Sequence, residues 1–283
     1  MNRKPTVVTE FLVHVALILA VCAALYPVLW VISLALAPSE LPQARALPIP
    51  TAVSLANFRA VAFATDTAGR WLFVRQLANS LIVSIATAVV AIGIATPAAY
   101  ALARFRFIGA EAGSKILIAT QMFPSVASAV PLYMILDALD LLDTHAGLVL
   151  VYATTAVPFA VFQLRSAFES IPRDLEEAAM VDGATRFQAF VKVVLPAARP
   201  GLAVTALFAF MSAWNEFILA ATFLSQERAF TLPVALQRYI GEYDAAWGKF
   251  AAGAILVSVP VMLIFYALQR HLVGGLTSGG VKG

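Results

Sequence analysis

Residues 176–196 read EEAAMVDGATRFQAFVKVVLP and form a charged, partly alanine-rich segment in the middle of a largely apolar chain. The segment is too polar to span a bilayer and too regular to be a simple linker. Pro172 precedes it and fits the first turn of a helix, and acidic residues follow, which are favourable near a helix N-terminus. Gly183 then predicts the end of this helix.

A second short helix is predicted directly after Gly183. Thr185 and Gln188 match a capping box, in which two side chains satisfy backbone groups at a helix N-terminus. Apolar residues then recur at helical spacing, and Pro196 is expected to end the helix. This apolar stripe consists of Phe187, Phe190, Val191 and Val194. The segment is therefore predicted to fold as helix, glycine bend and helix.

The first of these helices is suited to docking against a partner. Ala178 and Ala179 let another backbone approach closely, Glu177 offers a carboxylate beside them, and Asp182 falls on the same side. The second helix can lie with its apolar stripe on the protein's own transmembrane ends. The alternative is an amphipathic helix that only covers the bundle at the membrane surface, since such helices are common.

The composition places the whole chain in the membrane class. Its 283 residues are 61% hydrophobic and 12% charged, with a mean hydropathy of +0.86, whereas soluble domains carry about 25% charged residues. The net charge of +3 without a long basic run gives no reason to expect nucleic acid. The lone Cys22 is interpreted as lipid-facing or core filler, and with three scattered histidines it predicts no metal site.

Six apolar segments are each long enough for a transmembrane helix, which needs about 20 residues. They lie at about 11–37, 77–103, 114–136, 147–165, 201–225 and 249–270. The first is longer than the apolar core of a signal peptide and is interpreted as a retained span. The sequence thus predicts an all-α integral membrane protein, one domain over 1–283, with a long polar loop at 166–200 and a tail at 271–283.

The positions of Lys and Arg indicate the orientation of the spans. Of the 19 such residues, 12 fall on the side of the N-terminus and 7 on the opposite side. The positive-inside rule then places both termini and the loop 166–200 in the cytoplasm.

Glu216 is an ionisable residue within the fifth span. It lies about 15 residues from Gly201, or about 22 Å along a helix, which places it in the outer half of the membrane. Intramembrane charges are functional candidates, so Glu216 and its neighbour Asn215 are candidates for a translocation path. Gln121 and Ser125 in the third span are further candidates. The alternative for all four is hydrogen bonding between helices.

The spacing in the central segment resembles the EAA signature E-A-A-x3-G-x9-I-x-L-P of bacterial ABC-importer permeases, with valine at 193 as a conservative departure. The matching residues are Glu177, Ala178, Ala179, Gly183, Leu195 and Pro196. Residues 79–84 and 100–104 also resemble the family. Residues 121–124, 214–217 and 275–283 resemble its carbohydrate branch, and within it the maltose/maltodextrin or trehalose permeases.

The resemblance implies that 166–200 is a coupling loop, whose first helix docks into a cleft of a separate ATPase subunit. The coupling residues are then the matching set together with Asp182. The implied partners are a second, different permease, two ATPase subunits, an extracytoplasmic sugar-binding protein and the lipid of a bacterial inner membrane. Because the chain contains no G-x-x-x-x-G-K-[ST] phosphate loop, we expect it to bind no cofactor, with ATP and Mg²⁺ used by the ATPase subunits.

Two other classes of protein remain as alternatives. An ion-gradient-driven secondary transporter needs carboxylates near the membrane midplane and usually an internal repeat, and Glu216 alone is thin support. An integral-membrane enzyme needs catalytic groups clustered at one depth, and none is recognisable in the sequence. Neither alternative explains the loop that matches the EAA signature. We therefore predict a permease subunit without its own ATPase site.

Overall fold

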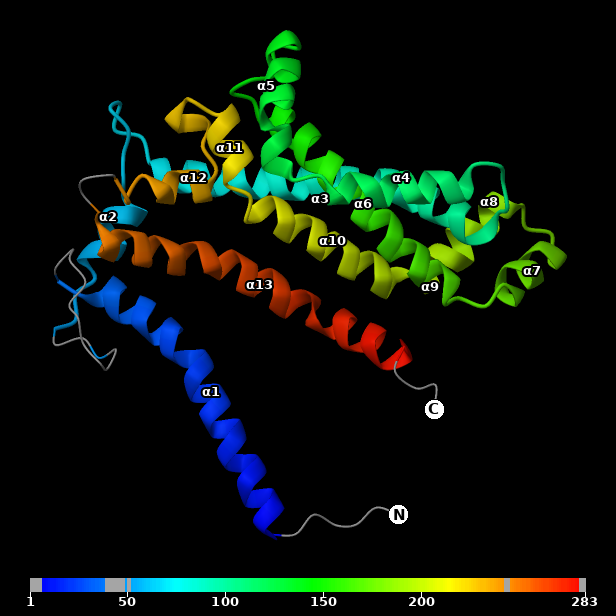
Figure 1. Ribbon diagram of the computed structural model, residues 1–283, viewed down its shortest axis with the longest axis horizontal. Coiled ribbons are helices and arrows are strands. Elements are labelled where there is room, and N and C mark those ends of the chain that lie inside the picture. Colours follow the sequence, from blue (N-terminus) through cyan, green and yellow to red (C-terminus); the bar gives the residue numbers. More distant parts are fainter. Residues whose placement is uncertain (1–6, 39–48, 50–51, 242–244, 280–283) are drawn as a thin grey trace. The chain divides into compact units, whose positions relative to one another are not determined.

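A computed structural model of the chain describes residues 7–38, 49, 52–241 and 245–279, and Figure 1 shows its helices. Within these ranges the β pairing is limited to two isolated bridges, Thr65 with Trp71 and Ile240 with Ala245. In the described part of the chain, four helices are long and apolar enough to cross a membrane, and two bent helix pairs bring the number to as many as six. The all-α membrane fold expected from the sequence is confirmed.

Four long helices correspond to the expected spans 11–37, 77–103, 147–165 and 249–270. They are α1 (Val7–Leu36), α3 (Leu72–Arg104), α6 (His145–Glu169) and α13 (Trp247–Gly279). The shorter helices are α2 (Ala56–Ala62), α4 (Ala110–Met122), α5 (Ala129–Ala138), α7 (Asp174–Val181), α8 (Arg186–Ala189), α9 (Leu195–Ala197), α10 (Arg199–Trp214), α11 (Ile218–Phe223) and α12 (Leu232–Gln237). The expected tail 271–283 continues α13 as far as Gly279, and residues 280–283 lie outside the described part.

The expected third span, 114–136, is made of two helices and not of one continuous helix. The helices α4 and α5 are separated by a 3-10 turn at Ser125–Ser128 and are bent by 91°. Pro124 explains the break, because the residue before a proline is pushed out of the helical conformation. Phe123 accordingly has an extended backbone, with φ −82° and ψ 126°.

The expected fifth span, 201–225, is also broken. The helix α10 ends at Trp214, and α11 begins at Ile218. The Glu216 carboxylate accepts hydrogen bonds from the backbone N–H groups of Leu219, at 2.9 Å, and Ala220, at 3.0 Å. It therefore satisfies the free N–H groups of a new helix start. The 16 residues of α10 alone extend about 24 Å, less than the about 30 Å of a bilayer core.

The chain groups into two compact units, Met1–Val74 with Leu236–Pro260 and Arg75–Ala235 with Val261–Gly283. In the first unit, Ala35 at the end of α1 packs with Ala251 and Ala252 of α13. The Asn57 side chain of α2 donates hydrogen bonds to the carbonyls of Ala35, at 3.2 Å, and Ala37, at 3.0 Å. These bonds satisfy carbonyl groups that the C-terminus of α1 leaves free.

In the second unit, α6 contacts α4, α10 and α11. Leu148 and Leu164 of α6 are fully buried and belong to two separate apolar clusters along the helix. The helices α6 and α10 approach closely where Gly201 faces Ala167, because a Cβ atom at Gly201 would lie 2.6 Å from the Ala167 Cβ. Small residues at such a crossing are the usual way in which membrane helices pack.

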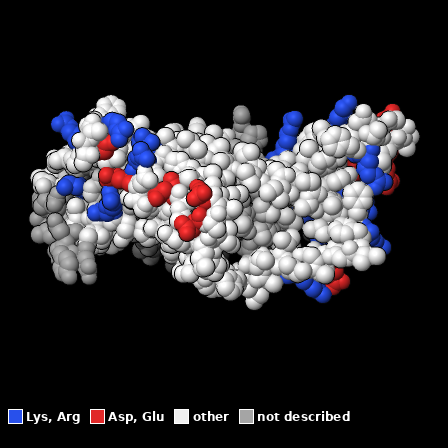
Figure 2. Space-filling model, turned by 90° about the horizontal axis from the view of Figure 1, so that it is seen from above, with Lys and Arg blue, Asp and Glu red and all other residues white. Residues whose placement is uncertain are grey.

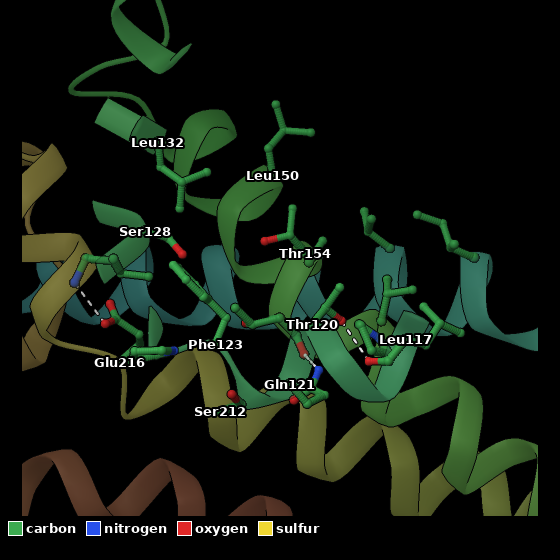
Figure 3. A pocket seen from close by; sticks show the side chains of 18 residues that line it. Leu117, Thr120, Gln121, Phe123, Ser128, Leu132, Leu150, Thr154, Ser212 and Glu216 are labelled. Carbon is green, nitrogen blue, oxygen red and sulfur yellow. Dashed lines mark hydrogen bonds between the residues drawn. The ribbon is translucent and has the colours of Figure 1, made fainter. Parts of the chain in front are cut away.

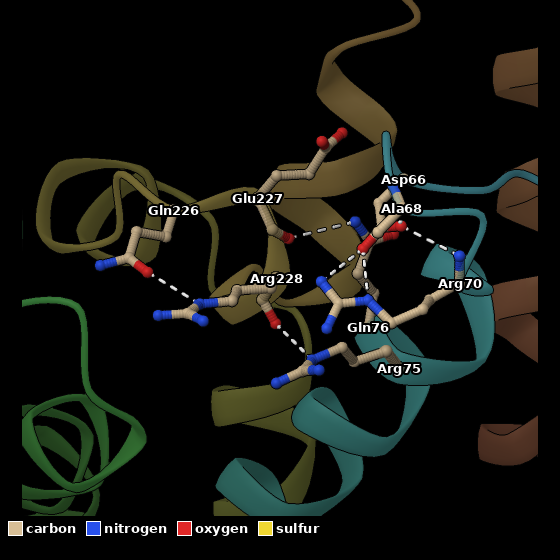
Figure 4. Close-up of polar contacts among 8 residues, drawn as sticks. All are labelled: Asp66, Ala68, Arg70, Arg75, Gln76, Gln226, Glu227 and Arg228. Atoms are coloured by element: carbon tan, nitrogen blue, oxygen red, sulfur yellow. Dashed lines mark hydrogen bonds and ion pairs between the residues drawn. The ribbon is translucent and has the colours of Figure 1, made fainter.

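Polar side chains at the start of α3 hold the loop that follows α11. The Gln76 amide donates to the Glu227 carbonyl at 3.4 Å, and Arg75 Nε donates to the Arg228 carbonyl at 3.1 Å (Figure 4). The Asn79 amide donates to the same Arg228 carbonyl at 2.9 Å. Gln76 and Asn79 are buried, so these bonds satisfy polar groups that would otherwise be unpaired in the membrane.

The charged side chains are distributed as expected for a membrane protein. Figure 2 shows a broad region of the visible face without Lys, Arg, Asp or Glu, with charged side chains on either side of it. Charges are expensive in hydrocarbon, so such a region is suited to contact with lipid.

Asp143, in the turn before α6, fixes the chain after α11. Its carboxylate accepts hydrogen bonds from the Ser225 N–H, the Ser225 hydroxyl and the Gln226 N–H. Burial alone raises the pKa of the Asp143 carboxyl, but these bonds and the charge of Arg228 outweigh it. The pKa of Asp143 therefore lies below its ordinary value.

This lowered pKa predicts a contact that weakens in acid. The contact stabilises the turn above the ordinary aspartate pKa of about 3.9 and is lost as the pH falls through the lower folded-state value. We expect hydrogen-exchange protection of the Ser225 and Gln226 amides to be constant above about pH 4 and to fall below it. The Asp143→Asn variant should lack this pH dependence, and an unchanged fall in that variant would contradict the prediction.

Candidate functional site

The segment 174–189 folds as helix, bend and helix. The helix α7 ends at Val181, and Gly183 follows with φ +89°, a conformation that side chains with a Cβ rarely adopt. Thr185 then caps α8. Its hydroxyl accepts from the Gln188 N–H at 3.2 Å, and the Gln188 side chain accepts from the Thr185 N–H at 2.8 Å. The bend and the capping box predicted from the sequence are both confirmed.

The second helix differs from the prediction at its end. Pro196 does not stop it, because Pro196 lies in the first turn of α9, where a missing N–H is tolerated. A π-helical turn at Phe190–Val194 links α8 to α9, and the chain then bends by 73° into α10. The predicted apolar stripe is also divided, because Val194 is buried whereas Phe187 is 74% exposed.

One side of α7 is open to solvent and carries residues of the predicted coupling set. Glu177, Ala178 and Asp182 are exposed. Two apolar side chains are exposed beside them, Leu175 and, at 87%, Val181. Apolar groups and carboxylates thus share one accessible surface, which is suited to contact with another protein.

Glu176, on the other side of α7, was missed as a site residue by the sequence reading, which treated it only as a helix N-terminal acid. It is buried and forms an ion pair with Arg104, whose side chain is 7% exposed. The Tyr100 hydroxyl donates a further hydrogen bond to Glu176 Oε2 at 2.8 Å. Arg104 and Tyr100 lie at the end of α3, within the residues 100–104 whose sequence resembles the family.

Two more hydrogen bonds join the end of α3 to the chain before α7. Arg104 Nη2 donates to the Ile171 carbonyl at 3.0 Å, and Arg173 Nη2 donates to the Ala103 carbonyl at 3.2 Å. We call Tyr100, Arg104, Arg173 and Glu176 the α3–α7 clamp. The three buried side chains of the clamp, Tyr100, Arg104 and Glu176, satisfy one another, which is the condition for burying charge without a large penalty.

A cavity of about 1050 Å³ lies among α3, α4, α6 and α10. Figure 3 shows its lining, in which hydroxyl groups alternate with apolar side chains and the ring of Phe123. The residues with hydroxyl groups are Thr120, Ser128, Thr154, Thr155 and Ser212. Gln121 and Glu216, two of the predicted path residues, are brought together in this lining.

The two lining residues have defined partners. The Gln121 side chain donates to the Thr155 carbonyl at 3.0 Å. Glu216 accepts from the buried Tyr152 hydroxyl at 2.7 Å, besides the two backbone N–H groups of α11. Both residues thus join helices as well as line the cavity. Lining a path and hydrogen bonding between helices, the two interpretations of these residues, are therefore compatible.

The other two predicted path residues are not placed in the cavity. Asn215 is exposed at the end of α10 and does not line the cavity. The side chain of Ser125 lies outside the described part. Among the described residues, no group of three or more His, Cys, Asp or Glu side chains is arranged to hold a metal ion.

Comparison with known proteins identifies the family. Residues 91–278 match the family described as binding-protein-dependent transport system inner membrane component. The trehalose transport system permease protein SugB of Mycobacterium tuberculosis is 42% identical over 269 residues, which cover 94% of this chain and 95% of SugB. The maltose/maltodextrin permease MalG of Escherichia coli is 35% identical, with 96% of each chain covered.

The fold is similar to that of a solved transporter. One chain in the crystal structure of a bacterial ABC transporter involved in the import of the acidic polysaccharide alginate superimposes with a TM-score of 0.78. That match is 25% identical in sequence and covers 95% of this chain and 99% of the other. The chain therefore belongs to the family of binding-protein-dependent transport system inner membrane components, as a multi-pass ABC permease subunit and not an enzyme.

Proposed function

We propose that this chain is one of two different permease subunits of an ATP-driven sugar importer. Its partners are a second permease, two ATPase subunits and an extracytoplasmic sugar-binding protein. The observation that carries the proposal is the matched segment at 177–196, because its first helix presents carboxylates and apolar side chains to solvent while its opposite side is tied to α3. A docking element must be accessible on one side and anchored on the other.

Maltose, maltodextrin or trehalose is the proposed substrate, on the basis of relatives named for their transport. The cavity lining supports a sugar. A sugar ring has hydroxyl groups around its edge and apolar C–H faces, and the lining offers both hydroxyl side chains and the exposed ring of Phe123. Such a mixture is typical of sites for small polar ligands.

The proposed mechanism is alternating access with both termini in the cytoplasm. ATP and Mg²⁺ are bound by the ATPase subunits, and their closure moves α7. The bundle then changes the side on which its path is open. The breaks after α4 and α10 support this mechanism, because both lie beside the cavity and interrupt helices that would otherwise be rigid.

The docking role of α7 predicts that Gly183→Leu and Glu177→Lys weaken binding of the ATPase. Leucine at Gly183 must adopt φ +89° or unfold the bend, at an energy of about 1–2 kcal/mol. Lysine at 177 reverses an exposed charge on the docking side. We expect about tenfold less ATPase to co-purify with either variant, which corresponds to about 1.4 kcal/mol.

Gly113→Leu is the matched control, since Gly113 has open space around it and an ordinary helical φ. That variant should retain the ATPase. Normal co-purification and normal ATP hydrolysis with Gly183→Leu and Glu177→Lys would contradict the docking role. ATP-dependent uptake in membrane vesicles that is lost without the partner ATPase would distinguish the importer from an ion-driven transporter.

A further inference from the structure

The helix α7 packs on α8 and on the π-helical turn after it, but its buried side chain is a charged one. The buried residue of this eight-residue helix is Glu176. A helix so short has little stability of its own. Its position relative to α3 is therefore set mainly by the α3–α7 clamp, in which Glu176 accepts hydrogen bonds from both Arg104 and Tyr100.

The clamp leads directly to the wall of the cavity. Arg104 is the last residue of α3, and Val90 and Ile94 of the same helix line the cavity. Ile94 is ten residues from Arg104, or about 15 Å along the helix. A displacement of α7 that pulls on Arg104 therefore acts on the helix that forms part of the path.

The chemistry of the clamp suits a link that must act in two directions. Apolar contacts resist separation but allow sliding, whereas a buried guanidinium held by a carboxylate and a carbonyl has a fixed geometry. Arg104 is held in this way by Glu176 and Ile171, and Tyr100 restrains the second carboxylate oxygen. Arg173, which precedes α7, adds a hydrogen bond whose donor lies on the α7 side and whose acceptor is the Ala103 carbonyl of α3.

We infer that Arg104 and Glu176, supported by Tyr100, are positioning residues that transmit the movement of α7 to α3 and so couple ATP hydrolysis to transport. This inference rests on the proposed function. It assigns the transmission step to the buried side of α7, which is distinct from the exposed side that docks.

The first arm of the test uses the purified permease alone. Glu176→Gln keeps the shape of the side chain but removes its charge, and Tyr100→Phe removes one hydroxyl while retaining the ring packing against Phe168 and Phe190. We expect amide exchange in 174–181 to rise about tenfold in Glu176→Gln and by a smaller factor in Tyr100→Phe. The control is Glu169→Gln, which removes the same charge from the exposed pair with Arg165.

The second arm uses the assembled importer with its ATPase subunits and binding protein, and labelled maltose or trehalose as the probe. We expect Glu176→Gln to retain the ATPase and to hydrolyse ATP, but to import about tenfold less sugar for each ATP hydrolysed. A purely structural role would lower assembly and both activities in parallel. Glu169→Gln should keep the normal ratio of sugar to ATP.

Unchanged amide exchange in residues 174–181 of Glu176→Gln would overturn the inference, because it would show that the clamp does not hold α7 in place. Faster exchange with a normal ratio of sugar to ATP, or a parallel loss of assembly and both activities, would overturn it at the level of transmission. Failure of the unmodified chain to couple uptake to ATP would instead contradict the proposed function, and this inference with it. Gly183→Leu serves as the comparison, because it should lose the ATPase itself.

Discussion

Replacing Glu216 with leucine should reduce uptake at least about tenfold. It should also lower the free energy of unfolding of the permease by about 3 kcal/mol. The carboxylate of Glu216 accepts hydrogen bonds from the Tyr152 hydroxyl and from the Leu219 and Ala220 N–H groups. Leucine leaves all three donors without this acceptor. Hydrogen bonds to charged groups contribute about 1.5–3 kcal/mol each, and part of the loss is recovered by relaxation.

Glu216→Gln separates geometry from charge. With its oxygen at the position of Oε2, the glutamine side chain can still accept from the Tyr152 hydroxyl and the Ala220 N–H, so only the Leu219 N–H loses its acceptor. We expect this variant to retain near-normal thermal stability in detergent. Asn215→Ala is the matched neighbour, since Asn215 is exposed and does not line the cavity. Stability and uptake of Glu216→Leu equal to those of Asn215→Ala would contradict a bracing role for Glu216.

Local signals were sufficient to predict the loop at 174–189. Gly183 and the Thr185–Gln188 box act through backbone bonds to residues within a few positions, so their geometry is contained in the sequence. The long apolar helices were equally predictable, because length and composition decide whether a segment can cross a bilayer. Both features depend little on the rest of the fold.

The breaks at Pro124 and Glu216 were not predicted, although both residues stand out in the sequence. Proline is tolerated inside membrane helices when neighbours satisfy the freed carbonyl, so its presence does not decide between a kink and a break. A glutamate in an apolar run can line a path or cap a helix. Tyr152, which lies 64 residues away, shows the bracing arrangement only once the helices are packed.

Glu176 illustrates the same limit in the loop at 174–189. Its neighbour Glu177 belongs to the matched motif and is exposed, whereas Glu176 is buried against Arg104, which is 72 residues away. In a helix of only eight residues, periodicity does not indicate which side faces the protein. A pairing between an arginine at the end of α3 and an acid in α7, with α4, α5 and α6 between them in the chain, is visible only in three dimensions.

Glu176→Leu should destabilise the permease by about 3–5 kcal/mol, because it leaves the buried guanidinium of Arg104 without its counter-charge. The double variant Arg104→Met with Glu176→Leu should recover most of this loss, since replacing both members of a buried pair with apolar residues of similar size is often neutral. Thermal unfolding of the detergent-purified chain measures the loss in the single variant and the recovery in the double variant. The cycle thus separates the energy of the pair from the damage done by removing one partner.

The exposed pair of Arg165 and Glu169 supplies the control for this cycle. Its side chains are 37% and 48% exposed, so Glu169→Leu should change stability by no more than about 1 kcal/mol. A loss for Glu176→Leu as small as that for Glu169→Leu would show that the α3–α7 clamp is not a buried pair in the membrane. If the double variant is stable but imports poorly for each ATP, stability and transmission are separate properties of the same two residues. That result is expected if fixed polar geometry, and not burial alone, carries the movement.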